Sequence, residues 1–238
     1  MTYPKAVVVI PTYNEAKNLV ALLPEILQFH LDVLVVDDGS ADGTAEVARN
    51  FDRVRVLSRP KKMGLGSAYI EGFSEVLKED YDLIIQMDAD GSHRADDLKK
   101  LLEHSEKETS VDLFIGSRWV RDGKIENWSR HREILSRGAN RYSQLLLGSA
   151  VRDLTSGFRI YRTSLLRKME LSQITSQGYG FQIEMTREAE RVGGRIVEVP
   201  ITFIERTIGK SKMSSEIVFE AMVKVTLWGL RRLNFKAR

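Results

Sequence analysis

The 238-residue sequence predicts an α/β fold in which a mostly parallel central sheet is flanked by helices. Two observations lead to this fold class. Through the first half of the chain, short β-branched runs alternate with segments that have apolar residues at helical spacing. The predicted strands are also nearly continuous hydrophobic runs, which is typical of parallel strands covered by helices on both faces.

The predicted elements follow one another in regular order as far as residue 116. Strands are expected at residues 5–10, 33–36, 54–57, 83–87 and 112–115, and helices at residues 14–29, 42–50, 66–78 and 96–105. Beyond this point the alternation stops. An arginine-rich segment, 118–141, leads into a helix that ends near Leu147; a strand at 158–161, a helix at about 181–192 and a strand at 195–204 follow.

Composition excludes several classes of protein. There is no cysteine, which excludes a disulfide scaffold, thiolate zinc sites and a cysteine nucleophile. The 42% hydrophobic and 29% charged content is that of a soluble globular protein. We find neither an apolar run long enough to span a membrane nor a signal-peptide pattern at the N-terminus, so the expected location is the cytosol.

Charge is distributed unevenly along the chain. Residues 1–205 hold 28 Lys and Arg against 31 Asp and Glu, whereas residues 206–238 hold 8 against 2. An anionic partner is therefore expected at the C-terminal end. Nucleic acid is not expected, because the chain has no zinc finger, repeat or basic strand interleaved with aromatic residues.

The C-terminal segment is expected to form a largely apolar helix over residues 214–233. Its polar residues fall on one narrow stripe: Glu216, Glu220, Lys224 and Arg231. Basic residues and aromatic side chains follow, as in helices that lie in a membrane interface. We therefore expect one domain over residues 1–212 and an amphipathic, basic helix over 213–238. The helix could meet a membrane, a membrane-anchored subunit or its own domain.

Acidic residues follow three of the predicted strands. The first strand runs into Pro11-Thr12-Tyr13-Asn14-Glu15, the second into Asp37-Asp38, and the fourth into Asp88-Ala89-Asp90. Ligands bind beyond the carboxyl ends of strands in open parallel sheets. Acids gathered on one such edge repel one another unless a cation or a hydrogen-bonding ligand joins them. The sequence therefore predicts a ligand site at this edge.

Asp88 and Asp90 are the predicted metal ligands. Residues two apart on an extended backbone point to the same side, and hard carboxylate oxygens suit Mg²⁺ or Mn²⁺. The alternative is an acidic turn ending in Gly91. Asp37 and Asp38 have a similar alternative, because Asp-Asp-Gly-Ser is also favourable in turns and helix caps.

A set of motifs in fixed order resembles the dolichol-phosphate (polyprenol-phosphate) mannosyltransferases, which are inverting glycosyltransferases of the family-2 type with the GT-A fold. The motifs are Pro-Thr-Tyr-Asn-Glu at 11–15, Val-Asp-Asp-Gly-Ser at 36–40, Gly-Leu-Gly-Ser-Ala-Tyr at 64–69, Met-Asp-Ala-Asp-Gly-Ser-His at 87–93, Gly-Ser-Arg at 116–118, Ser-Arg-Gly-Ala-Asn at 136–140, Asp-Leu-Thr-Ser-Gly-Phe-Arg at 153–159 and Gly-Lys-Ser-Lys at 209–212. The resemblance extends from about residue 7 to 215.

This resemblance implies roles for individual residues. The guanosine of GDP-mannose would be held by Pro11, Tyr13, Glu15, Val36 and Asp38. The ribose, diphosphate and metal would be met by Asp88, Ala89 and Asp90, and further phosphate contacts would come from Arg118, Arg206 and Lys212. Ser92 stands where some members have a glutamine that helps to hold the metal. The expected metal set is therefore Asp88, Asp90 and Ser92, with either Mg²⁺ or Mn²⁺ as cofactor.

The implied reaction depends on positive charge that stabilises phosphate groups and does not require a general base. A phosphate monoester, with a second pKa of about 6, is largely a dianion in the cytosol and can attack without a general base. The residues assigned to catalysis are Asp90, Arg118, Arg206 and Lys212, and those assigned to the acceptor phosphate are Arg118, Arg132 and Arg137. Asp153 is the candidate should a base be required. For Arg132 and Arg137 a solvated basic face is the alternative.

The expected function is transfer of mannose from GDP-mannose to a polyprenyl phosphate on the cytosolic face of a membrane. Two alternatives stay open at this point. One keeps the fold and acceptor but uses UDP-glucose or another nucleotide sugar, because Asp38 and Tyr13 alone do not distinguish guanine from uracil. The other is a scaffold that binds GDP-mannose without turnover.

Overall fold

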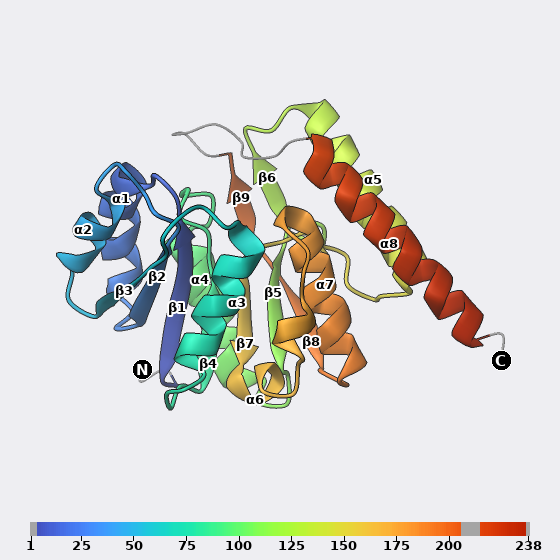
Figure 1. The fold of residues 1–238 in the computed structure, drawn as a ribbon. Coiled ribbons are helices and arrows are strands. Elements are labelled where there is room, and N and C mark those ends of the chain that lie inside the picture. Colours follow the sequence, from blue (N-terminus) through green and yellow to red (C-terminus); the bar gives the residue numbers. More distant parts are fainter. Residues whose placement is uncertain (1–3, 206–214, 237–238) are drawn as a thin grey trace.

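A central sheet with helices on both faces forms the body of the protein (Figure 1). The computed structural model describes residues 4–205 and 215–236. Within them the main sheet consists of β1 (Ala6–Thr12), β2 (Asp32–Asp37), β3 (Val54–Ser58), β4 (Leu83–Gln86), β5 (Leu113–Ser117), β7 (Arg159–Arg162) and β8 (Ile196–Pro200). The helices are α1 (Ala16–Leu27), α2 (Thr44–Arg49), α3 (Leu65–Val76), α4 (Ala95–Lys107), α5 (Arg130–Leu147), α6 (Thr163–Leu166), α7 (Gly178–Arg191) and α8 (Ser215–Lys236), with a 3-10 turn at Leu171–Gln173.

The order of strands explains the hydrophobic sequence runs. The sheet runs β3-β2-β1-β4-β7-β5-β8, and only β7 is antiparallel to its neighbours. Successive residues of β1 alternate between two cores: Val8 and Ile10 pack with α1 and α4, whereas Val7 and Val9 pack with α3 and α7. Both faces of the strand are therefore buried, and the expected α/β class is confirmed.

The predicted strand at 195–204 is wrong as a single element. β8 ends at Pro200, and the chain then enters β9 (Thr202–Ile204), which pairs with β6 (Lys124–Glu126) in a separate two-stranded sheet. Pro200 has no amide hydrogen with which to continue a ladder, and Ile201 donates its own amide to Ser117 O at 3.1 Å. The elements β6, α6 and the 3-10 turn are not predicted from the sequence, because they are too short to show a hydrophobic period.

Helix α5 has clear signals at both ends. The Ser129 hydroxyl accepts from the amide of Arg132 at its start, and Gly148 ends it in the left-handed region at φ 62°. The helix ends at Leu147, where the sequence predicts its end. The helix runs beside α8 on the right of the molecule (Figure 1).

Helix α8 is covered on one side only. It packs against α5 and α7, with Tyr142 Oη and Thr226 Oγ1 at 2.7 Å and Lys224 Nζ donating to Ser176 Oγ at 3.0 Å. Its other side exposes an apolar strip consisting of Phe219, Val223, Leu227 and Leu230. The structure thus combines packing on the domain with an exposed apolar face. None of the helices in residues 4–205 and 215–236 has the length and apolar character needed to cross a bilayer.

Candidate active site

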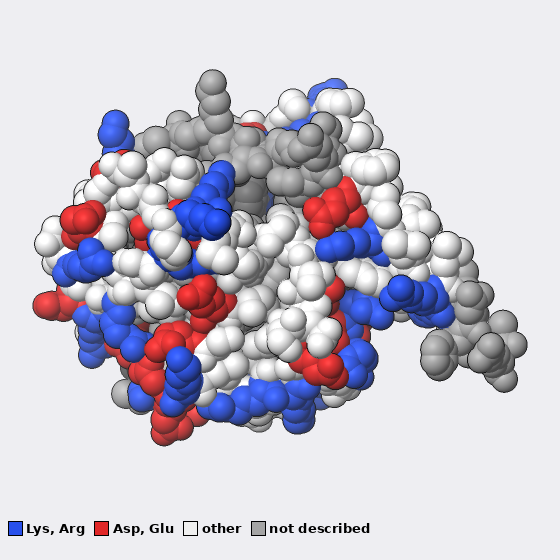
Figure 2. Space-filling model, viewed as in Figure 1, with Lys and Arg blue, Asp and Glu red and all other residues white. Residues whose placement is uncertain are grey.

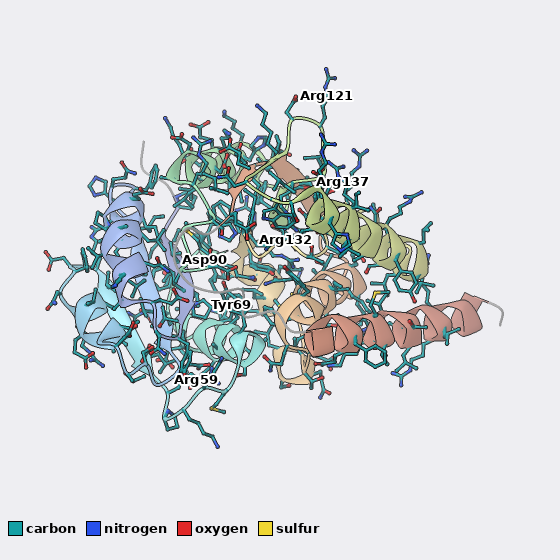
Figure 3. The ribbon with its side chains drawn as sticks, turned by 90° about the horizontal axis from the view of Figure 1, so that it is seen from above. Arg59, Tyr69, Asp90, Arg121, Arg132 and Arg137 are labelled. Carbon is teal, nitrogen blue, oxygen red and sulfur yellow. The ribbon has the colours of Figure 1, made fainter. Side chains whose placement is uncertain are left out.

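The acidic strand ends meet at one edge of the sheet. β2 and β4 lie on either side of β1, and all three run parallel. Tyr13 follows β1, Asp38 follows β2 and Asp88 closely follows β4 at the same carboxyl edge. Figure 3 looks down on this edge from above, with Asp90 and Tyr69 near its centre.

Asp37 has partners of its own within the protein. It accepts from Thr12 Oγ1 at 3.0 Å and from Ser40 Oγ at 2.5 Å. These bonds tie the end of β1 to the turn after β2. The turn role that the sequence left open therefore accounts for this carboxylate.

Asp38 is buried and organises the segment that leads from β3 into α3. Arg59 Nη1 donates to its Oδ1 at 2.5 Å, and the amides of Met63 and Gly64 donate to its Oδ2 at 3.1 and 3.0 Å. Arg59, also buried, donates to Ser67 Oγ at 2.6 Å. Asp38 thus fixes a loop beside the expected nucleotide site. Its contact with a base stays a prediction.

The other expected guanosine contacts lie next to this loop. Pro11 and Val36 are register partners in β1 and β2, and both are buried. Lys62 lies over the Tyr13 ring, 4.6 Å from its centre, and Glu15 is the N-cap residue of α1. The strand ends therefore bring the four residues to one region, as their motifs predict.

Asp88 is held by a buried tyrosine. Tyr69 Oη, from α3, donates to Asp88 Oδ1 at 2.8 Å, and its ring stacks on Phe181 of α7 with centres 5.6 Å apart. Burial, together with the nearby Asp88 carboxylate, raises the pKa of Tyr69 well above its usual value. The phenol therefore stays protonated and serves as a fixed donor to this carboxylate.

Asp90 and Ser92 complete the expected metal set. Asp90 Oδ1 accepts from the amide of Ser92 at 3.1 Å, while Ala89 between the two aspartates is buried in the core. The Ser92 hydroxyl is buried and has no hydrogen-bond partner among the described residues. Two carboxylates and an unused hydroxyl fit Mg²⁺ or Mn²⁺, which complete their shell with phosphate and water. Across the described ranges, no group of three or more His, Cys, Asp and Glu side chains is arranged to hold a metal by itself.

His93 is buried and contacts the backbone of Asp88. Its Nδ1 accepts from the amide of Asp88 at 3.3 Å, and its ring stacks on Phe158 with centres 4.6 Å apart. Burial lowers the pKa of His93, so the ring is neutral with its proton on Nε2. The bond fixes the backbone from which the Asp88 side chain projects.

Arg118 is paired with Asp153 inside the protein. Arg118 Nε and Nη2 donate to the two oxygens of Asp153 at 2.8 and 2.6 Å, and Nη2 also donates to Thr155 Oγ1 at 2.9 Å. Its guanidinium lies 5.5 Å from the Trp128 ring centre and 5.3 Å from that of Phe203. Burial acts to lower the pKa of Arg118, but Asp153 raises it above its usual value. The side chain is therefore charged, and its contact with an acceptor phosphate stays a prediction.

Arg132 and Arg137 both project from α5. Arg132 pairs with Glu205 and lies over the Trp128 ring, 4.0 Å from its centre. Arg137 Nε donates to Glu133 at 2.9 Å, and its side chain is 56% exposed. Seen from above, Arg132 lies between Asp90 and Arg137 (Figure 3). Of the two, Arg132 is therefore better placed to reach the acidic edge. The remaining expected phosphate contacts, Arg206 and Lys212, lie outside the described residues.

Sequence reasoning assigned no role to Tyr69 or His93. Both occur in quoted motifs, but their contacts with Asp88 join residues whose packing a linear pattern does not reveal. Asp153, a candidate base by its sequence motif, is the fully buried partner of Arg118 in the structure. Arg118 and Asp153 are 35 residues apart, and no sequence pattern predicts that two such distant residues form an ion pair.

Comparison with known proteins identifies the family. Residues 7–170 match Glycosyl transferase family 2. The chain belongs to this family. The matched range includes the acidic edge, Arg118, Asp153 and the arginines of α5, and the chain is a glycosyltransferase.

Two curated relatives extend the similarity over nearly the whole glycosyltransferase chain. A polyprenol monophosphomannose synthase of Mycolicibacterium smegmatis is 45% identical, with 98% of this chain and 90% of the relative covered. An undecaprenyl-phosphate mannosyltransferase of Micrococcus luteus is 47% identical, with 95% and 94% covered. The resemblance inferred from the sequence motifs is therefore confirmed.

A solved structure supports the GT-A fold. Glucosyl-3-phosphoglycerate synthase from Mycobacterium tuberculosis, in a complex with Mn²⁺ and UDP-glucose, superimposes with a TM-score of 0.68. The alignment covers 96% of this chain and 79% of that one at 20% identity. At this identity the likeness shows the fold alone, and it confirms the GT-A architecture.

Proposed function

We propose that this glycosyltransferase moves mannose from GDP-mannose to a polyprenyl phosphate, with inversion at the anomeric carbon. The observation that supports this most strongly is the 45–47% identity, over nearly the full length, to a polyprenol monophosphomannose synthase and an undecaprenyl-phosphate mannosyltransferase. The residues at the sheet edge supply carboxylates and arginines in the combination that a diphosphate donor and a phosphate acceptor require.

The reaction balances without an added base. An oxygen of the acceptor phosphate forms a bond to the anomeric carbon while the bond from that carbon to the β-phosphate oxygen of GDP breaks. The bonding electrons leave with GDP. A phosphate monoester with a second pKa of about 6 is already largely dianionic, so no proton has to be removed from the nucleophile.

Asp88, Asp90 and Ser92 are the residues that would hold a divalent cation, Mg²⁺ or Mn²⁺. When bound, such an ion supplies positive charge for the oxygens of the departing diphosphate. Tyr69 and His93 orient Asp88 by the hydrogen bonds described above. The protein therefore contributes metal-binding side chains whose orientation is fixed before the donor binds.

The arginines are proposed to orient the acceptor. Arg132, between Asp90 and Arg137 in Figure 3, is the first candidate for its phosphate. Arg118, which lies over the same Trp128 ring as Arg132, and Arg137 are the further candidates. In this arrangement Asp153 holds Arg118 in place and keeps it charged. Arg206 and Lys212 are proposed to contact the donor phosphates, as the motifs imply.

The lipid acceptor gives the apolar strip of α8 a role. Phe219 is 70% exposed and Leu230 is 53% exposed, on the side of α8 that its own domain leaves uncovered. Apolar side chains along one side of a helix are typical of docking in a membrane interface. We propose peripheral attachment through this strip, on the cytosolic face, directly or beside a membrane-anchored subunit.

A donor comparison tests the proposal. Purified protein is incubated with undecaprenyl phosphate, Mg²⁺ or Mn²⁺, and radiolabelled GDP-mannose or UDP-glucose, and the label in the lipid phase is counted. We expect transfer from GDP-mannose only. Preferential transfer from UDP-glucose would show that GDP-mannose is the wrong donor. Binding of GDP-mannose without transfer under every condition would favour a non-catalytic scaffold.

A further inference from the structure

A basic cavity of about 810 Å³ lies beyond the proposed active site, between the C-terminal half of α5, the segment 148–152 and α8. Four arginines line it, from three separate parts of the chain: Arg137, Arg141, Arg152 and Arg232. Among the residues that the structure describes, no acidic side chain lines it. The cavity therefore presents positive charge from several sides.

Most of this charge is not neutralised within the protein. Across the described ranges, the guanidinium groups of Arg141, Arg152 and Arg232 make no ion pair within 4.0 Å, and only Arg137 has a carboxylate partner, Glu133. Bringing guanidinium groups together without counter-charge is unfavourable unless an anion joins them. The arrangement therefore calls for an anionic ligand.

The carboxylates nearest the cavity have other partners. Glu190 accepts from Ser149 Oγ at 2.6 Å, and Glu198 accepts from the amides of Arg152 and Asp153, both at 2.8 Å. The pKa of Glu190 is raised by burial, against the opposing effects of Ser149 and Arg232. These two acids stabilise the segment that forms the cavity wall. Glu190 also interacts electrostatically with Arg232, but among the described residues neither acid forms an ion pair within 4.0 Å with an arginine of the cavity.

Two further features indicate a built site. Trp119 lines the cavity, and its indole N–H is shielded from solvent without an acceptor among the described residues. Gly148 makes room for Arg232, because a Cβ at position 148 would overlap the guanidinium. The glycine that ends α5 thus also permits this arginine to reach the wall of the cavity.

We propose that the basic cavity binds the phosphate group of an anionic ligand through Arg141, Arg152 and Arg232, next to the acceptor site, with which it shares Arg137. A volume of about 810 Å³ accommodates a glycerophosphate-sized headgroup. Leu145, which lines the cavity, is 65% exposed, and Leu230 of the apolar strip, near Arg232 in α8, is 53% exposed. Apolar side chains beside a cluster of arginines favour a phospholipid headgroup over a soluble phosphate.

The surface around α8 fits this assignment. Figure 2 shows acidic and basic side chains on the inner side of α8, with Lys and Arg prevailing toward its lower part, while the right-hand slope is mostly uncharged. A bilayer that meets the apolar strip would bring its headgroups to the level of the basic cavity. The proposal concerns anion binding and does not depend on which sugar the enzyme transfers.

Flotation with vesicles tests the proposal on the full chain. Binding to phosphatidylcholine vesicles with and without phosphatidylglycerol is compared for wild type, Arg141→Gln, Arg152→Gln and the double variant. Arg121→Gln is the matched control, because Arg121 is exposed on the same basic segment but points away from the cavity (Figure 3). Inorganic phosphate and glycerol 3-phosphate are titrated separately, with tryptophan fluorescence as readout, since Trp119 lines the cavity.

We expect each cavity substitution to weaken binding to phosphatidylglycerol vesicles about fivefold, which corresponds to about 1 kcal/mol per arginine near an anionic surface. The Arg121→Gln control should bind as wild type does. Saturable binding of soluble phosphate that is lost in the double variant, with vesicle binding unchanged, would assign the cavity to a soluble phosphate ligand.

Two results would overturn the proposal. One is equal loss in Arg121→Gln and in the double variant, which would indicate general surface attraction. The other is a raised KM for polyprenyl phosphate in detergent with unchanged phosphatidylglycerol binding, which would make the cavity part of the acceptor site. Because the flotation and phosphate titrations measure anion binding without any transfer of sugar, failure of mannosyl transfer alone would contradict the proposed function and leave this inference intact.

Discussion

Asp90 is the residue on which the proposed metal site depends most directly. Replacing it by alanine removes one of two carboxylates and the acceptor for the Ser92 amide. We expect Asp90→Ala to lower kcat/KM at least about a hundredfold, since charge stabilisation at a leaving group typically contributes that much. Asp96→Ala, an exposed aspartate paired with Arg94, is the control. Near-normal transfer by Asp90→Ala would show that the metal assignment is wrong.

Tyr69 allows a subtler test of the same site. Tyr69→Phe keeps the ring against Phe181 but removes the donor to Asp88. We expect the apparent affinity for Mn²⁺, measured by titration in the transfer assay, to fall about tenfold to a hundredfold, as for other partners of metal ligands. Tyr81→Phe is the matched control, because it also removes a hydrogen bond from a tyrosine to an aspartate, here Asp32 at the start of β2. Equal effects of the two changes would mean that Tyr69 contributes only stability.

Arg118 has both a structural and a proposed acceptor role, and lysine separates them. Arg118→Lys keeps the charge but cannot reproduce the two-pronged contact with Asp153. We expect a loss of about 1 to 3 kcal/mol in unfolding free energy, and a rise in acceptor KM of about tenfold with a smaller rise for GDP-mannose. Arg55→Lys, in an exposed pair with Glu79, should change little. Equal KM increases would place Arg118 on the donor, and unchanged KM values would leave only the structural role.

Helix α3 rests on the sheet through a glycine. A Cβ at position 72 would lie 2.6 Å from Val9 Cγ1 and 2.9 Å from Val36 Cγ2, in strands that have no room to move apart. We expect Gly72→Ala to destabilise the protein by about 1 to 3 kcal/mol. The penalty for overpacking should exceed the gain of up to about 1 kcal/mol in helix propensity.

Gly138 in α5 provides the control for this experiment, because nothing lies within 4 Å of an added Cβ there. Gly138→Ala should stabilise the protein by up to about 1 kcal/mol. Urea unfolding at constant slope measures both changes. A stabilising Gly72→Ala would contradict the close contact of α3 with β1 and β2.

At the scale of elements, the sequence predicts helices and strands best where the hydrophobic pattern is long and depends only on neighbouring residues. The alternation of apolar runs through residue 116 locates β1 to β5 and α1 to α4 within a few residues, because each element buries its own face. The strand at 195–204 failed because its division depends on Ser117 and on β6, which lie far away in sequence.

At the scale of the whole molecule, the position of the acidic edge could be predicted from the sequence, but the contacts that hold its side chains could not. Parallel strands bring their carboxyl ends together by topology, so Asp38 and Asp88 could be placed on one edge from the sequence. The contacts of Tyr69 with Asp88 and of Arg118 with Asp153 depend on how helices and loops pack over that edge. The basic cavity likewise exists only because α8 returns to lie beside α5.

The apolar strip of α8 determines how the whole molecule meets its lipid substrate. Leu227, half exposed on this strip, would enter the membrane interface in the proposed attachment. We expect Leu227→Glu to weaken binding to phosphatidylcholine-phosphatidylglycerol vesicles about tenfold, because it forfeits about 1 to 2 kcal/mol of apolar burial. Val20→Glu is the matched control, since Val20 is equally exposed but lies on α1, at the opposite end of the molecule (Figure 1). Co-sedimentation measures both variants. If Leu227→Glu binds vesicles as wild type does while Val20→Glu does not, the molecule meets the membrane through its other end, and the strip of α8 must face a protein partner.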